Sequence, residues 1–251
     1  MERHLTASGK AAPSRRPARH RRLRDRAAVD EILTQAAQVP HAVDPAVLER
    51  VARSIESSFG PVRPLPPAWA LAGGLVLICA AVAGAGAARL GLYGIQNLSV
   101  LGIALVFPVL VILICLAAME FVGEMTPGSR RRVAPGFLLA AGCLALLAVF
   151  AAVFRNYGTE QFVPQGVACL TAGLLHAIPA ALASWLLLRR GFAVNSIAAG
   201  VVAGTLAGLA GVTMLELHCA NFEAPHVMLW HTAVMPLCAG AGALLARVAR
   251  R

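Results

Sequence analysis

The chain has 251 residues, of which 58% are hydrophobic and only 14% are charged. Soluble domains average about 25% charged residues, so the composition excludes an ordinary soluble domain and indicates an integral membrane protein. The formal net charge is +10, which in a soluble protein would suggest nucleic-acid binding. Because many basic residues flank long apolar segments, membrane topology explains them better, and we expect no direct contact with nucleic acid.

Residues 1–43 form a basic extension that is rich in Arg, Pro and Ala near its start. No apolar run follows this stretch, so we expect no secretory signal peptide. We predict a largely disordered cytoplasmic segment. Apolar residues at helical spacing within it predict one short amphipathic helix over 26–38, whose face consists of Val29, Ile32, Leu33 and Ala36.

A second amphipathic helix is predicted in the region 44–67, directly before the apolar part of the chain. Asp44 is placed to cap its N-terminus, and Pro45 suits its first turn. Two interpretations remain open: a helix that lies on the membrane surface, or one that docks into a groove of a partner protein. A Pro-rich linker then leads to the first span. The candidate partner contacts on the apolar stripe are Leu48, Val51, Ile55 and Phe59.

Residues 68–246 contain six apolar stretches, each near the roughly 20 residues that cross a bilayer as a helix. We expect no Asp, Glu, Lys or Arg inside these spans, which argues against an ion-coupled transporter. The predicted fold is an all-α integral membrane protein with six transmembrane helices preceded by short amphipathic cytoplasmic helices. The spans are expected at about 68–88, 98–119, 135–154, 166–188, 192–214 and 226–246.

Arginines in the loops predict the orientation. Only Arg89 and Arg155 lie on one side of the membrane. By the positive-inside rule, both termini, including the basic tail 247–251, are expected in the cytoplasm. The loops at 89–97, 155–165 and 215–225 then face outward. The arginines expected on the cytoplasmic side are Arg130, Arg131, Arg132, Arg189, Arg190, Arg247, Arg250 and Arg251.

Glycines predict close contacts between helices. Gly200, Gly204 and Gly208 recur every fourth residue in the fifth span, and Gly211 continues the series. Small residues at this spacing allow helix backbones to approach closely. We interpret three further glycines in the same way, namely Gly102, Gly240 and Gly242.

Two of the six cysteines stand apart from the others. Cys219 lies in an outward loop, and Cys169 lies near the outward end of the fourth span, so topology places both on one side at similar depth. The pair is either a static disulfide, two unrelated thiols, or a sensor of oxidants or thiophilic metals. The other four are interpreted as apolar packing residues inside the spans: Cys79, Cys115, Cys143 and Cys238.

Three histidines lie in or beside the polar segment 215–231. His218 is adjacent to Cys219 and is placed to activate its thiol or to ligate a metal. His226 and His231 are five residues apart, which separates them by about 140° around an α-helix. We therefore expect poor geometry for a shared metal, and the identity of any metal stays open.

Motifs of common enzyme classes are absent from the sequence. It has no P-loop, nucleophile elbow, HExxH motif or dinucleotide fingerprint, so we expect neither an enzyme nor a cofactor. The main alternative is a membrane redox enzyme that exchanges disulfides or electrons with a quinone, although the lack of a CxxC motif argues against it. A structural or transport bundle without a regulatory partner is a further alternative.

Four segments between Asp44 and the C-terminus form a distinctive combination. They are the amphipathic helix running into PVRPLPPAW (61–69), the PGSRRR turn (127–132), the stretch from Cys169 through LLLRRG (186–191), and LHCANFEAPHVMLWH (217–231). Together they resemble the NrsF family of six-span membrane anti-sigma factors.

The resemblance implies a protein that holds an extracytoplasmic-function (ECF) sigma factor inactive at the bacterial inner membrane. Envelope stress, such as oxidants or heavy metals, would release the sigma factor. The resemblance also implies an outward-facing sensing pair, matched here by Cys169 and Cys219, and a sigma-factor contact, matched by 47–59. The chain departs from the family pattern in its basic extension, 1–43, and in lacking a Pro directly after Cys219.

Overall fold

The computed structural model describes residues 29–32, 34–35, 44–58, 66–126, 128–129, 133–191, 193 and 195–249. The chain divides into two units, Met1–Arg63 and Pro64–Arg251, and each is described by itself. In the first unit, residues 29–32 and 34–35 are helical, as predicted. Leu33, Ala36 and Phe59 lie outside the described residues.

Helix α2 (Pro45–Ser58) is the longest element that the structure describes in the first unit. The side chain of Asp44 caps it, because its Oδ1 accepts a hydrogen bond of 2.9 Å from the backbone N–H of Ala46. The predicted cap is therefore confirmed. The apolar stripe of α2 is exposed to about half of its full extent, with 55% for Leu48, 49% for Val51 and 47% for Ile55.

The second unit is a bundle of α-helices, and six of its helical segments are long and apolar enough to cross a membrane. The prediction of an all-α, multi-pass membrane protein is confirmed for the described residues. The spans are α3 (Ala68–Leu90), α5 (Val100–Met125), α6 (Pro135–Val153), α7 (Phe162–Leu188), α8 (Ser196–His218) and a last segment made of α9 (Ala224–His226), the π-helical turn η1 (Val227–His231) and α10 (Thr232–Val248).

Two helices continue past the predicted ends of their spans and include acidic residues. Helix α5 contains Glu120 and Glu124, and α8 contains Glu216. The predicted stretches themselves contain no acidic residue, as expected, and the glutamates lie where the helices continue beyond them. In α8 the predicted span ended at Met214, but the helix continues because its last turn is covered by protein. Glu216 is buried, and Gly94 of α4 (Tyr93–Asn97) packs against the backbone of Glu216.

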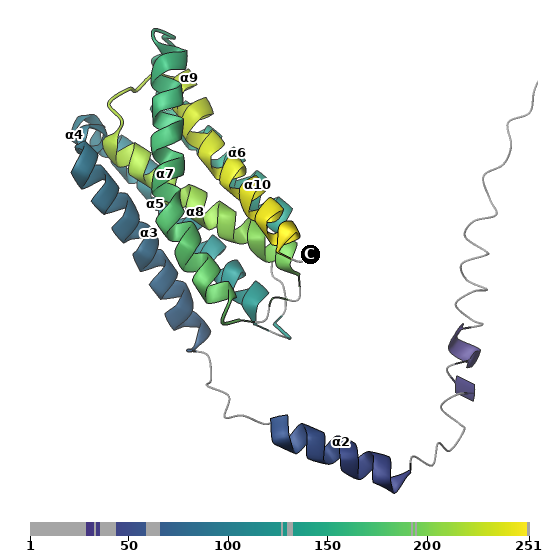
Figure 1. The fold of residues 1–251 in the computed structure, drawn as a ribbon. Coiled ribbons are helices and arrows are strands. Elements are labelled where there is room, and N and C mark those ends of the chain that lie inside the picture. The colour runs from purple at the N-terminus through teal and green to yellow at the C-terminus, as the bar shows by residue number, and fades with distance from the viewer. Residues whose placement is uncertain are drawn as a thin grey trace, which may run out of the picture. The chain divides into compact units, whose positions relative to one another are not determined.

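Helix α8 lies at the centre of the bundle, with α3, α5, α7 and α10 packed around it (Figure 1). Its most apolar window is 83% buried inside the protein, whereas the corresponding windows of the other five spans are only 22–33% buried. The outer helices thus leave apolar side chains for lipid, while α8 contacts mainly other helices.

Glycines explain how closely the neighbours approach α8. A Cβ on Gly204 would collide with the backbone of Cys238 in α10, and one on Gly211 would collide with the carbonyl of Gly173 in α7. The predicted close packing of the fifth span is confirmed. Gly240 is different, because a Cβ added there would have nothing within 4 Å, so its interpretation as a packing residue is wrong. The other predicted glycines that make tight contacts are Gly102, Gly200, Gly208 and Gly242.

Successive connections between the spans lie alternately at the two ends of the bundle. At the α4 end, His218 contacts the carbonyl of Gly91, and the N–H of Ala224 donates to the carbonyl of Asn156 at 2.6 Å. At the opposite end, where α3 begins, Gly191 packs against Met125. The α4 end holds the loops predicted to face outward, and this orientation stays a prediction.

Candidate functional site

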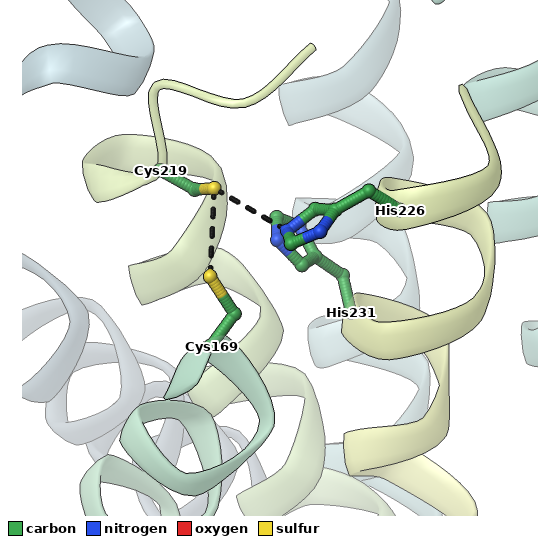
Figure 2. Close-up of side chains that lie close together, drawn as sticks. All are labelled: Cys169, Cys219, His226 and His231. Atoms are coloured by element: carbon green, nitrogen blue, oxygen red, sulfur yellow. Dashed lines mark hydrogen bonds between the residues drawn. The ribbon is translucent and has the colours of Figure 1, made fainter. Parts of the chain in front are cut away.

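Four side chains from three helical segments converge at the α4 end of the bundle (Figure 2). Cys169 comes from α7, Cys219 follows α8 directly, His226 ends α9 and His231 ends η1. One sulfur or ring-nitrogen atom from each lies within 4.8 Å of those of the other three. Cys219 and both histidines are buried, and Cys169 is partly exposed.

The two thiols are in direct contact without being bonded. Their Sγ atoms lie 3.6 Å apart, and both cysteines are free. The sequence placed them on one side at similar depth, and the structure brings them together. An S–S bond is about 2.05 Å long, so a movement of about 1.5 Å would join them.

The end of α8 fixes the position of Cys219. Its backbone N–H donates to the carbonyl of Leu215 at 2.7 Å, which makes Cys219 the C-cap of the helix. The hydrogen bond with Cys169 and burial raise the pKa of the Cys219 thiol, while His226 and His231 act in the opposite direction. A raised pKa favours the protonated thiol, which is a weaker nucleophile than the thiolate.

A single π-helical turn brings the two histidines together. Residues Val227–His231 form this turn, η1, and in a π-helix residue i+5 lies above residue i, as i+4 does in an α-helix. The rings of His226 and His231 consequently meet edge to face, with centroids 5.3 Å apart. The expectation of poor geometry, which assumed an α-helix, is wrong for this reason.

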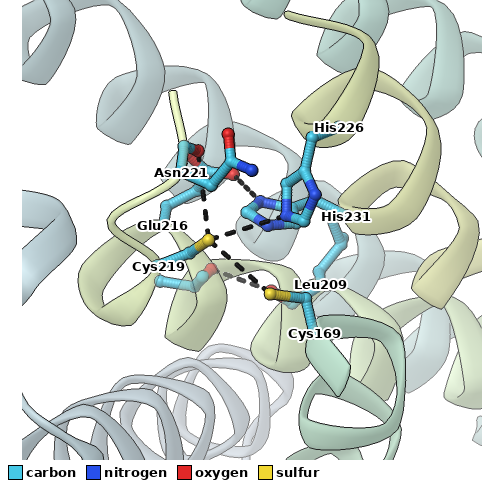
Figure 3. Close-up of polar contacts among 8 residues, drawn as sticks. Cys169, Leu209, Glu216, Cys219, Asn221, His226 and His231 are labelled. Carbon is cyan, nitrogen blue, oxygen red and sulfur yellow. Dashed lines mark hydrogen bonds and ion pairs between the residues drawn. The ribbon is translucent and has the colours of Figure 1, made fainter. Parts of the chain in front are cut away.

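A buried carboxylate orients His231 (Figure 3). Nδ1 of His231 lies 2.6 Å from Oε1 of Glu216, and both side chains are almost completely buried. When the ring is neutral and Nδ1–H donates to the carboxylate, the lone pair of the ring is on Nε2, the form in which a histidine can bind a metal. This Nε2 is buried and has no hydrogen-bond partner among the described residues. Sequence analysis missed Glu216 because it was assigned to a loop.

The segment after Cys219 is anchored to its surroundings. Asn221 donates from its side-chain Nδ2 to Oε1 of Gln165 in α7 at 2.7 Å. Its Oδ1 accepts from the N–H of Glu223 at 2.8 Å, and Phe222 stacks on Phe154. The segment after Cys219 is thus held against α7, the helix that carries Cys169, although the chain lacks the Pro that the family pattern has directly after this cysteine.

His218 lies outside the cluster. Its Nδ1 is 3.0 Å from the carbonyl oxygen of Gly91, and its ring is tilted against that of Tyr93. Adjacency in sequence to Cys219 therefore does not bring it to the thiols, because consecutive residues at the end of a helix point in different directions. His218 holds the α3–α4 connection against α8.

A model of the NrsF family, described as negative regulator of sigma F, matches residues 57–251. This chain belongs to the NrsF family. Neither a curated protein nor a solved structure matches it. Membership confirms the resemblance seen in the sequence. The description of the family implies negative regulation of a sigma factor, which is the role of a regulator and not of an enzyme.

The matched region of this NrsF protein contains all four clustered residues and Glu216, but it begins only at the end of α2. The candidate partner contacts Leu48, Val51 and Ile55 therefore lie before the match. The site at the α4 end belongs to the family part of the chain, and the exposed stripe of α2 precedes it.

Proposed function

We propose that this protein is an anti-sigma factor that sequesters an ECF sigma factor at the bacterial inner membrane. It releases the sigma factor when outward-facing Cys169 and Cys219 respond to oxidant or metal stress. The observation that carries the sensing half is the 3.6 Å contact between the two sulfurs, which lie on different helices. Membership of the NrsF family supports the regulatory half.

The position of α8 supplies a route from the thiols to the other end of the bundle. Joining Cys169 to Cys219 draws the end of α8 toward α7. Because α8 is packed backbone to backbone against α10 at Gly204, such a shift repacks several helices rather than one. A tenfold loss of sigma-factor affinity needs only about 1.4 kcal/mol of coupling free energy between the two sites.

The stripe of α2 is the proposed sigma-factor contact. Leu48 and Val51 expose about half of their surface, and an amphipathic helix of this kind fits an apolar groove of a partner. In the chain, α2 precedes α3, and α3 begins at the end of the bundle opposite the thiols. If the α4 end faces outward, as the arginines predict, then α2 is on the cytoplasmic side, where the sigma factor is; this orientation supports the proposed contact.

The decisive experiment captures sigma factors on the full-length protein in native membranes or detergent. The wild-type chain is expected to retain one ECF sigma factor and to release it after treatment with hydrogen peroxide. Cys219→Ser is expected to retain the sigma factor under both conditions, and Cys115→Ser, which changes an exposed cysteine outside the site, is expected to behave as wild type.

Two outcomes would contradict the proposal. If no sigma factor is captured under either reducing or oxidising conditions, the protein does not sequester an ECF sigma factor. Release from Cys219→Ser at the wild-type peroxide concentration would show that the thiol pair is not the sensor.

A further inference from the structure

We infer that the reduced cluster is a zinc site in which Zn²⁺ is bound by Cys169 Sγ, Cys219 Sγ, and one ring nitrogen each of His226 and His231. Two thiolates and two imidazoles are the ligand set of structural zinc sites. The binding of zinc stands on the geometry alone, whereas its link to regulation rests on the proposed function.

Two of the six distances between the donor atoms fit a regular tetrahedron around Zn²⁺, and all four atoms lie within 4.8 Å of one another. With Zn–S of about 2.3 Å and Zn–N of about 2.0–2.1 Å, a regular tetrahedron has S···S edges of about 3.8 Å and S···N edges of about 3.6 Å. The Cys169–Cys219 sulfurs are 3.6 Å apart, and Cys219 Sγ lies 3.7 Å from Nε2 of His226. Both edges agree with the expected values to within about 0.2 Å.

The surroundings of His231 support the same inference independently. Histidines that bind metals usually donate their second ring N–H to a carboxylate, which fixes the tautomer and raises the basicity of the donor nitrogen. Glu216 does this for His231 at 2.6 Å. Nε2 of His231 is left buried and without a partner among the described residues, a costly state that a metal bond would relieve.

The enclosure of the site indicates a bound ion with a structural role. The rings of His226 and His231 have 0% and 1% of their surface exposed, and Cys219 has 9%. A closed site whose four ligands all come from protein leaves no open position for a substrate. Sulfur and imidazole ligands in tetrahedral order select Zn²⁺ over Mg²⁺ and Ca²⁺, which prefer oxygen.

Zinc connects the cluster to oxidant sensing by a balanced reaction. A peroxide molecule takes two electrons from the two zinc-bound thiolates, and with two protons its O–O bond is reduced to two waters. Both Zn–S bonds break, the Cys169–Cys219 disulfide forms, and Zn²⁺ leaves the two remaining histidines. The partial exposure of Cys169 gives the oxidant its point of attack.

The first test measures metal in the full-length protein purified in detergent under reducing conditions. We expect about one zinc per chain by mass spectrometry, and less than a tenth of that in Cys219→Ser and His231→Ala. His218→Ala is the matched control, since His218 is the neighbour of Cys219 but bonds to Gly91, and it is expected to keep its zinc. A zinc-free wild-type chain that also fails to take up added Zn²⁺ overturns the inference.

Two further variants separate loss of a ligand from loss of folding. His226→Cys keeps a zinc ligand and is expected to retain the metal. Glu216→Gln leaves all four ligands in place and is expected to weaken zinc binding by about 10- to 100-fold, as measured by competition with a chromogenic chelator. Co²⁺ bound to the wild-type chain should show the intense visible absorption of a tetrahedral thiolate site. An octahedral spectrum, or equal affinity in Glu216→Gln, contradicts the inferred geometry.

Measuring sigma-factor capture on the same preparations distinguishes this inference from the proposed function. Peroxide is expected to release one zinc per disulfide formed, whether or not a sigma factor is bound. Release of the sigma factor by peroxide from a chain that never binds zinc would overturn the zinc site and leave the proposed function standing. A chain that binds and releases zinc but captures no sigma factor would overturn the proposed function alone.

Discussion

Gly204 of α8 lies directly against the carbonyl group of Cys238 in α10, with no space between the two backbones for a Cβ atom. Helix α8 leads to Cys219, and α10 continues from the turn that carries His231. Two of the three helical segments that supply the site are therefore in backbone contact. A rearrangement of one of them requires the other to move.

This contact predicts opposite effects for two similar glycine substitutions. Gly204→Ala should destabilise the protein by about 1–3 kcal/mol, because overpacking forces backbones apart. Gly240→Ala has open space around it and should be neutral or stabilising by up to about 1 kcal/mol, because Ala favours a helix more than Gly does. Thermal unfolding in detergent measures both. Equal unfolding temperatures for the two variants would contradict the tight α8–α10 packing.

The π-helical turn predicts that the chain tolerates one particular deletion. Leu229 lies within the turn and its side chain is 54% exposed. Removing it should convert the turn to α-helix and leave His226 and His231 four residues apart, again on one face. We expect the variant to fold, with both histidines still at the thiols, as measured by unfolding temperature and by zinc content.

Leu237 provides the matched deletion. It is 49% exposed but lies in the regular part of α10. Its removal rotates the rest of the helix by about 100° relative to α8 and should disrupt the packing of the helices. If deletion of Leu229 is as damaging as deletion of Leu237, the π-helical turn is not what aligns the histidines.

The exposed stripe of α2 predicts a charge-sensitive partner contact. Leu48→Glu and Val51→Glu should each lower capture of the sigma factor at least tenfold, because a carboxylate in an apolar groove is costly to desolvate. The control is Arg50→Glu, which changes charge on the other side of the helix. Since neither Leu48 nor Val51 belongs to the cluster of cysteines and histidines, zinc content should not change. Capture that survives both stripe variants would exclude this helix as the contact.

The arginine distribution predicts the orientation of the bundle. Alkaline phosphatase fused after Gly158 should be active, because that enzyme needs disulfides formed outside the cytoplasm. The same enzyme fused after Ser129, in the loop at the opposite end, should be inactive. A fluorescent protein fused at the same position should fluoresce. The reverse pattern would place the thiol pair in the cytoplasm and contradict the proposed route of sensing.

The length of the apolar runs was enough to predict the six spans, because each run is long and apolar enough to cross a bilayer as a helix. The cap on α2 was also predictable, since Asp44 and Pro45 act locally. Span ends were harder to predict. Helix α8 continues past the predicted end at Met214 to His218 because α4 packs against its last turn. The sequence around Met214 gives no sign of this contact.

Only part of the site could be predicted from the sequence. Topology and the family resemblance both drew attention to Cys169 and Cys219. The meeting of His226 with His231 was missed, because a shift from α-helical to π-helical hydrogen bonding changes the angle between residues without changing their spacing. Glu216 was missed for a related reason: its partner His231 lies in another span, and only folding brings the two together.

The enclosure of α8 has a consequence for how a surrounding membrane would act on Cys219. In the most apolar window of α8, 83% of the residues are buried by protein, whereas only 22–33% are buried in the other five spans. Changes in bilayer thickness or lateral pressure therefore act first on the five outer helices, and they reach Cys219 only after being averaged over several contacts. A chemical change at Cys219 acts on α8 at once. For the proposed thiol sensor, this arrangement predicts a weak response to changes in the bilayer and a direct response to a chemical change at Cys219.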